Sequence, residues 1–376
     1  MASLLPFLVL YYAQLGFTGR QIGVLSALLP VMTLLGVPLW SAAADASGRY
    51  RAIILLSVGT ALVCTLAASS VTSYLGLLGV VGALSFCVAP IMPLTDTAVL
   101  TLLQNERHRY GNLRLWGAVG WGVGAPLTGW LVGRGQRLGE GVGELRWAFW
   151  VAAALLGSLW AVGYTLPRLE PTPPQKSRTV RGLVSPVWLG FLLIGLTGGV
   201  CLAVSSNFLY LHMTALGMRA SFVGLALTAA TLSEVPVFFF SGRLLRRYSA
   251  RTLLLSALTV FAARLFLYSV FAAPWPILAL QLLHGPSFSL LWAAGVAYAD
   301  QHAPEGFRAT AQGFFSAALL GWGGVVGALI GGTLYDAYGA AVMFRWVAAG
   351  TAAVCLGVSV WGVYGRKTRN LQKGPL

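Results

Sequence analysis

The chain has 376 residues, of which 57% are hydrophobic and only 9% are charged. This composition excludes a soluble protein with a solvated surface and is typical of a polytopic membrane protein. The formal net charge of +15 would suit a nucleic-acid-binding protein, but the basic residues are divided among loops and form no single tract. We therefore expect a lipid bilayer, and no nucleic acid, as the partner of this chain.

Apolar runs long enough to cross the hydrocarbon, which takes about 20 residues as a helix, recur along the chain. The first run, 2–15, is too short to cross, and we interpret it as the outer half of a first helix whose beginning is missing. Full spans are predicted at 22–43, 52–70, 75–103, 112–133, 147–166, 187–211, 221–242, 252–271, 277–300, 310–332 and 342–364. The predicted fold class is an all-α membrane protein with twelve transmembrane helices.

The single long polar connection is 167–186, which is rich in proline and basic residues and has no apolar periodicity. Such a segment is typical of a flexible linker. It divides the chain into two predicted six-helix bundles, 1–166 and 187–364, and a tail follows at 365–376. Internal division of this kind is common in secondary transporters.

The distribution of basic residues predicts the orientation in the membrane. With the short first run counted as helix 1, eighteen of the 25 lysines and arginines fall on one side and six on the other, while Arg264 lies within a span. The positive-inside rule then places both termini and the linker in the cytoplasm. A bacterial-type inner membrane is the expected location.

Chemistry-bearing motifs of enzymes are not recognisable in the sequence. The four cysteines fall inside apolar spans without paired spacing, so neither a disulfide nor a metal site is expected. There is no phosphate-binding loop and no nucleophile with an acid and a base at familiar spacing. We therefore expect no enzyme activity and no cofactor.

Polar residues on one hairpin of the first half point to a ligand site. Asp96 and Arg114 lie on successive antiparallel helices, and the midpoint between them falls in the turn, so the two residues are expected at the same depth. Trp121 follows Arg114 by seven residues, which is about two helical turns and nearly the same face. An acid, a guanidinium and an indole together predict a substrate-binding site.

The same midpoint test applies to three ionisable residues of the second half. Glu234, Arg264 and His284 lie on three successive spans and are expected to be level near the middle of the bilayer. Charged groups there cost at least about 2.5 kcal/mol each, so they normally face one another or an aqueous cavity. One alternative is a structural ion pair of Glu234 with Arg264, with His284 filling space beside it.

The turn SAAADASGRYR at 41–51 resembles the loop between helices 2 and 3 of the major facilitator superfamily. In that loop a carboxylate, a glycine and basic residues brace two helices, and here Asp45, Gly48, Arg49 and Arg51 take those places. The resemblance is partial, because Ser41 replaces an expected glycine.

Longer stretches are similar to the lactose permease and phenylpropionate permease branch of that superfamily. They are PLTD, YGNLRLWGAVGWGVGAPLTGWLV, LSEVPVFFFSGRLLRRYSARTLLLSA and QLLHGPSFSLLW. The resemblance implies the major facilitator fold and the absence of about fifteen residues of helix 1 at the N-terminus. It also implies substrate binding by Asp96, Arg114, Trp121 and Arg264, and proton coupling by Glu234, Arg264 and His284.

The sequence departs from lactose permease where that protein carries a second acid one turn after the histidine, because Ser287 stands there. The resemblance nonetheless favours a proton-coupled symporter that imports a small organic solute, such as a sugar or an aromatic acid, by alternating access as a monomer. Two alternatives stay open. APLTG at 125–129 partly matches a motif of drug antiporters, which suggests an exporter, and a membrane sensor without transport is the other.

Overall fold

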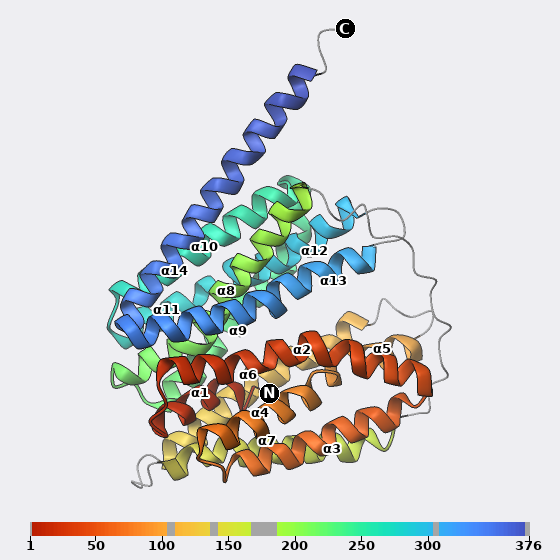
Figure 1. The fold of residues 1–376 in the computed structure, drawn as a ribbon, viewed down its shortest axis with the longest axis vertical. Coiled ribbons are helices and arrows are strands. Elements are labelled where there is room, and N and C mark those ends of the chain that lie inside the picture. Colours follow the sequence, from red (N-terminus) through yellow and green to blue (C-terminus); the bar gives the residue numbers. More distant parts are fainter. Residues whose placement is uncertain (1, 104–109, 136–141, 167–185, 304–307, 373–376) are drawn as a thin grey trace.

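The computed structural model describes residues 2–103, 110–135, 142–166, 186–303 and 308–372, and within these ranges the chain forms helices and no strand. Nine described helical segments are long and apolar enough to cross a membrane. Figure 1 shows long helices lying side by side in two groups. The prediction of an all-α membrane protein is confirmed.

The first half of the chain forms the lower group in Figure 1. Its helices are α1 (Leu5–Gln14), α2 (Gly19–Ser47), α3 (Tyr50–Ala68), α4 (Tyr74–Val88), α5 (Ile91–Leu103), α6 (Tyr110–Gly135) and α7 (Val142–Gly163). Residues 75–103, predicted as one span, form two helices because the chain is interrupted at Ala89 and Pro90. Pro90 removes one backbone donor at this point, and the apolar span nevertheless continues across the break from Tyr74 to Asp96.

The second half forms the upper group. Its α-helices are α8 (Pro186–Ala215), α9 (Ala220–Arg247), α10 (Ala250–Val270), α11 (Pro274–Leu280), α12 (Leu290–His302), α13 (Arg308–Ser316) and α14 (Gly323–Gln372). Shorter turns interrupt two spans: the 3₁₀ turn η3 (Gln281–Leu283) and the π turns η4 (Gly285–Ser289) and η5 (Ala317–Trp322). Within α14 the backbone is non-helical at Gly339, whose φ is 76°, and the chain turns back there.

The predicted spans fall on these helices. The predicted linker at 167–186 lies outside the described residues except for its last residue, which begins α8. The boundaries of the predicted division, 1–166, 187–364 and a tail at 365–376, therefore stay a prediction. The two groups of helices agree with a division of the chain into two halves.

The two groups make close contact at one end of the molecule, where α1 joins α2 and α8 joins α9. The backbone N–H of Gly19 donates to Oδ1 of Asp336 at 3.2 Å. A Cβ atom on Gly23 would lie 2.6 Å from the carbonyl oxygen of Ala328, and one on Gly224 would lie 2.9 Å from Cα of Pro126. Only residues without side chains allow helices from the two halves to approach this closely.

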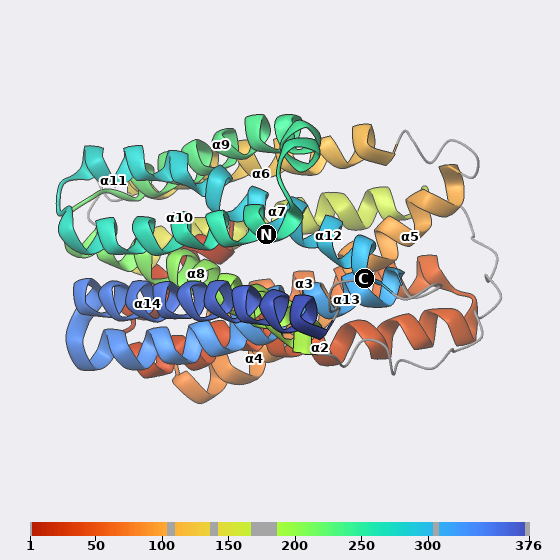
Figure 2. The same ribbon diagram turned by 90° about the horizontal axis from the view of Figure 1, so that it is seen from above.

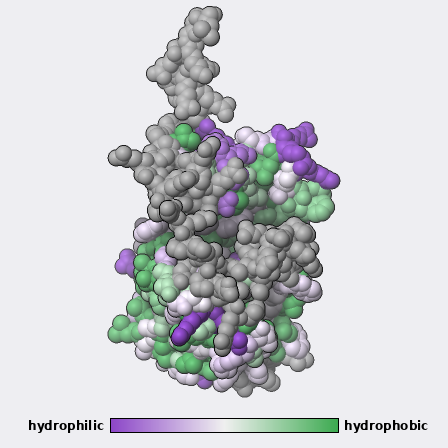
Figure 3. Space-filling model, turned by 90° about the vertical axis from the view of Figure 1, so that its right-hand side faces the viewer, coloured by the Kyte–Doolittle hydropathy of each residue, from purple (hydrophilic) through white to green (hydrophobic). Residues whose placement is uncertain are grey.

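The same helices separate towards the other end, which is the end predicted to face the cytoplasm. In Figure 1, α2 diverges from left to right from the helical stretch formed by α13, η5 and the first part of α14. Figure 2, seen from above, shows α6 lying along α9, the second pair of helices through which the two groups meet. Trp116 on α6 and Phe239 on α9, both towards this end, are 71% and 75% exposed. Figure 3 looks onto this end, where hydrophilic residues show at the upper edge and in smaller groups lower down. The two groups of helices therefore pack closely at one end, called the closed end below, and diverge towards the other, called the open end.

Each half carries the same brace between its third helix and its last. Arg51 of α3 donates to the carbonyl oxygen of Tyr164, just after α7, and Arg251 of α10 donates to that of Val358 in α14 at 2.7 Å. These matched contacts are what two structural repeats would produce. The carbonyl oxygen of Tyr164, just past the end of α7, has no later helical N–H to bond with, and Arg51 satisfies it.

The turn between α2 and α3 contains the predicted loop motif. Gly48 ends α2 with φ 63°, a left-handed conformation that favours glycine, and its N–H donates to the carbonyl oxygen of Ala44. Arg49 lies at the start of α3. The side chain of Asp45 lies outside the described residues, so the role predicted for this carboxylate stays a prediction.

Candidate functional site

A buried arginine stands at the centre of the second half. Arg264 on α10 is only 2% exposed, and its guanidinium donates three hydrogen bonds. Nε bonds to the Tyr268 hydroxyl at 2.6 Å, and two terminal nitrogens bond to Oε1 of Gln281 and Nδ1 of His284, both at 2.9 Å. Uncompensated burial of a charge costs several kcal/mol or more, and these partners replace part of the lost hydration.

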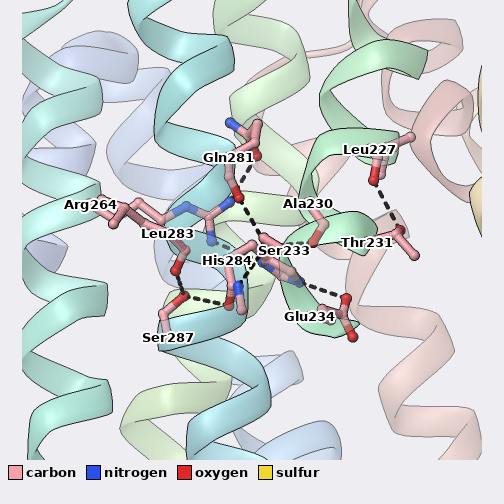
Figure 4. A network of polar contacts seen from close by, with 11 residues as sticks. Leu227, Ala230, Thr231, Ser233, Glu234, Arg264, Gln281, Leu283, His284 and Ser287 are labelled. Atoms are coloured by element: carbon pink, nitrogen blue, oxygen red, sulfur yellow. Dashed lines mark hydrogen bonds and ion pairs between the residues drawn. The ribbon is translucent and has the colours of Figure 1, made fainter. Parts of the chain in front are cut away.

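His284 links this arginine to Glu234. Its Nε2 lies 3.3 Å from Oε1 of Glu234, while Nδ1 faces Arg264 (Figure 4). Arginine has only donors, so Nδ1 must accept, and a neutral imidazole then carries its proton on Nε2 and donates it to the carboxylate. Among the described residues, Glu234 makes no direct ion pair with Arg264. The imidazole therefore lies between the two charges that were predicted to share one depth.

The side chains of Glu234, His284 and Arg264 differ in their access to solvent. Those of His284 and Glu234 are 15% and 24% exposed, while Arg264 is enclosed. The carboxylate and the imidazole are therefore accessible from outside the protein, whereas the guanidinium is not.

Close packing between α9 and the turn after His284 fixes these groups. A Cβ atom on Gly285 would lie 2.0 Å from the carbonyl oxygen of Ser233, and the Gly285 N–H donates to the Ser233 hydroxyl at 2.8 Å. Gly285 also begins the π turn η4, and π turns in helices occur frequently at functional sites. The residue preceding Glu234 is thus joined directly to the residue following His284.

Ser287 follows in the same π turn. It is fully buried, and its hydroxyl donates to the carbonyl oxygens of Leu283 and His284, at 2.8 and 3.0 Å. The position that carries an acid in the resembled permease is therefore occupied by a side chain that bonds to its own helix.

The hairpin predicted to bind substrate lies on α5 and α6. Asp96 is half-buried on α5, and the indole of Trp121 on α6 is 38% exposed. Arg114 lies on α6, but its side chain is outside the described residues. Whether Asp96 and Arg114 face each other therefore stays a prediction.

Contacts between α6 and α9 show how the two parts of the site relate. A Cβ atom on Gly122 would lie 3.7 Å from Cγ2 of Thr231, and one on Gly133 would lie 3.8 Å from Cβ of Ser221. The two helices are thus antiparallel, and Trp121 is about level with Thr231. Since Thr231 precedes Glu234 by three residues, Trp121 and Glu234 lie within about one turn of the same depth.

Comparison with known proteins accounts for this architecture. A family model described as the MFS_1 like family matches residues 1–346. The chain belongs to this family. It is a membrane transporter of the major facilitator superfamily and adopts the major facilitator fold with two six-helix bundles.

Two relatives illustrate the family. The maltose permease of Geobacillus stearothermophilus is 29% identical over 350 residues, which cover 91% of this chain and 86% of that protein. A protein of Escherichia coli (strain K12) named "Probable 3-phenylpropionic acid transporter" is 29% identical over 357 residues, covering 92% and 89%. The predicted resemblance to this branch is confirmed, as is the prediction that the chain is no enzyme.

Solved structures share the fold. The nucleoside transporter NupG superimposes with a TM-score of 0.81 and 19% identity, covering 96% of this chain and 94% of that one. A POT family transporter in complex with a thioalcohol-conjugated peptide gives a TM-score of 0.76 at 12% identity, covering 96% and 93%. At such identities these structures show the fold alone.

Two residues of this transporter's site were not singled out from the sequence. Gln281 and Tyr268 are uncharged, so nothing in the composition of their spans marks them. The signal available was spacing, because Tyr268 lies four residues after Arg264 and Gln281 three before His284, each one turn away on the same face. Among the described residues, no cluster of His, Cys, Asp or Glu could hold a metal ion.

Proposed function

We propose that this transporter is a proton-coupled symporter that imports a small organic solute, such as a sugar or an aromatic acid, by alternating access. The observation that carries the proposal is the series of contacts from the partly exposed Glu234 through His284 to the buried Arg264. A carboxylate that is both reachable and electrostatically tied to the protein interior is suited to taking up and releasing a proton.

Glu234 is the proposed proton carrier. When ionised, it accepts the Nε2–H of His284 and lies one imidazole away from the Arg264 charge. When protonated, Glu234 is neutral and no longer balances the charge of Arg264. The net charge of the site then changes by one unit inside the membrane, where charges interact strongly. Arg264 and His284 are proposed to couple this change to movement of the second half.

The solute is proposed to bind between the halves, with Asp96, Arg114 and Trp121 on one side and the Glu234 region on the other. The exposed indole offers an apolar ring face against which a sugar or an aromatic ring can pack. A carboxylate or hydroxyl of the solute would meet the fork of Arg114. The Arg264 guanidinium has its three donor edges occupied in this conformation, so we propose that it acts on the solute through His284.

The names of the relatives, a maltose permease and a 3-phenylpropionic acid transporter, are compatible with either solute class. We further propose that the open end faces the cytoplasm of a bacterial-type cell, with both termini there, and that a single chain suffices. The charge distribution supports the orientation, and the proposed site draws all its residues from one chain.

Uptake into proteoliposomes tests this function. Purified protein would be assayed with labelled maltose and 3-phenylpropionate, with and without an imposed inward proton gradient. We expect one of them, or a chemical relative, to accumulate only with the gradient. Glu234→Gln should abolish this accumulation, because an amide cannot take up and release a proton. It should leave the rate of solute counterflow within about twofold of the wild-type rate, since the amide oxygen still accepts a hydrogen bond from His284.

Two outcomes would contradict the proposal. Accumulation by Glu234→Gln at the wild-type level would remove Glu234 as proton carrier. Gradient-driven movement of the solute out of the vesicles, with none inwards, would instead indicate the exporter that APLTG at 125–129 suggests.

A further inference from the structure

The groups that hold Arg264 form a closed arrangement of their own. Gln281 accepts from Arg264 through Oε1, and its Nε2 donates to the Tyr268 hydroxyl at 2.9 Å and to the carbonyl oxygen of Ile277 at 3.1 Å. The Tyr268 hydroxyl in turn accepts from Nε of Arg264. All three side chains are at most 2% exposed. Each side chain is therefore held by the other two, and that of Gln281 is also held by the backbone.

This arrangement determines where the remaining edge of the guanidinium points. A guanidinium is planar and presents its N–H groups in a rigid fork. With Nε held by Tyr268 and one terminal nitrogen held by Gln281, the other terminal nitrogen is directed at Nδ1 of His284. Without either neutral partner, the fork would be free to rotate away from the imidazole.

We propose that Tyr268 and Gln281 are positioning residues of the coupling site. By orienting Arg264, they keep Nδ1 of His284 without a proton and so direct the Nε2–H at Glu234. Neither residue needs to contact the solute or to exchange a proton. The assignment of the histidine tautomer stands on the hydrogen bonds alone, while its consequence for transport rests on the proposed symport.

Both of these partners of Arg264 are neutral, and their neutrality matters for the coupling site. No carboxylate of the described residues lies within 4.0 Å of the Arg264 guanidinium, so its charge is shared only through the imidazole with Glu234. A charged partner at position 281 would compete with Glu234 for the guanidinium. An amide and a phenol hold the side chain in place and leave its charge available to the His284–Glu234 pair.

The tautomer of His284 is measurable in the purified protein. The chain has four histidines, so ¹⁵N-histidine labelling gives few NMR signals, and loss of one set in His284→Gln identifies those of His284. We expect a single neutral tautomer in the wild type, with the proton on Nε2. In Tyr268→Phe and Gln281→Met, a mixture of tautomers or a protonated ring should replace it.

Transport provides the second readout. In both variants gradient-driven accumulation should fall about tenfold or more, which is the effect expected from losing a hydrogen bond to a buried charge. The rate of counterflow should stay within about twofold of the wild-type rate. Tyr298→Phe is the matched control, because Tyr298 is a buried tyrosine on α12 that stacks on His302. That variant should retain both the wild-type tautomer and accumulation.

The results separate this proposal from the proposed symport. A proton on Nδ1 of His284 in the wild type, or an unchanged tautomer in folded Tyr268→Phe or Gln281→Met, would overturn the positioning role whatever the transport data. Even if both variants fail to fold, a wild-type proton on Nδ1 would still overturn the proposal. Absence of gradient-driven uptake by a wild type with the expected tautomer would overturn symport and leave the orientation of Arg264 standing.

Discussion

At the scale of residues, the site depends on uncharged side chains as much as on charged ones. Glu234, Arg264 and His284 could be found from sequence because ionisable residues in apolar spans are costly and therefore conspicuous. Their common depth followed from counting residues across the turns. That the imidazole lies between the two charges depends on how α9 and α10 are rotated, which counting cannot supply.

Gly285 illustrates a constraint that is invisible in the sequence. A methyl group there would overlap the Ser233 carbonyl, since the added Cβ would lie 2.0 Å from its oxygen. We expect Gly285→Ala to destabilise the protein by about 1–3 kcal/mol, the usual cost of overpacking, and to reduce transport. Thermal unfolding in detergent measures the first effect.

The control for that substitution is Gly82→Ala on α4, where an added Cβ meets no atom within 4 Å. It should leave the unfolding temperature unchanged or raise it, because alanine favours the helix. Equal unfolding temperatures for Gly285→Ala and Gly82→Ala would show that the α9 contact is looser than described.

Trp121 carries the prediction for solute binding. Trp121→Ala should raise the half-saturating solute concentration about tenfold, since the loss of a ring contact costs roughly 1 kcal/mol or somewhat more. Trp116→Ala on the same helix removes an indole that is more exposed, at 71%, and should change this concentration less than twofold. Initial uptake rates over a range of concentrations distinguish the two, and an equal effect of both substitutions would argue against Trp121 as a binding residue.

At the scale of elements, the positions of the spans were predictable and their interruptions were not. Long apolar runs separated by polar turns locate helices well, and 112–133 was observed as α6 (Tyr110–Gly135). The π turn η4 and the break between α4 and α5 depend on local packing around prolines and glycines. These interruptions lie in the spans that carry His284 and Asp96, so the parts hardest to predict adjoin the site.

The contact of α6 with α9 at the closed end yields a test of helix movement. The added Cβ of Gly133 would lie 3.8 Å from Cβ of Ser221, which is close to the usual separation in a disulfide. We expect Gly133→Cys with Ser221→Cys, in a background without the four natural cysteines, to form a disulfide and to stop transport. Reducing agent should restore it.

Each single cysteine variant serves as the control and should transport under oxidising and reducing conditions alike. Full transport by the cross-linked protein, with the disulfide verified by mass spectrometry, would mean that α6 and α9 need not separate at this end during the cycle.

At the scale of the whole molecule, the two halves meet through glycines at one end and diverge at the other. This is the geometry that one state of an alternating-access cycle requires. Membership of the MFS_1 like family shows that the chain is a transporter of this kind. The energy source is what the family leaves open, and the Glu234–His284–Arg264 chain is the reason to expect protons.

The most direct test of proton coupling is to record both fluxes in the same vesicles. Solute would be added to de-energised proteoliposomes at equal internal and external pH, while external pH and solute uptake are followed together. We predict a transient external alkalinisation that accompanies solute entry in a fixed ratio and disappears in Glu234→Gln. Solute entry into wild-type vesicles without any change in external pH would contradict proton symport.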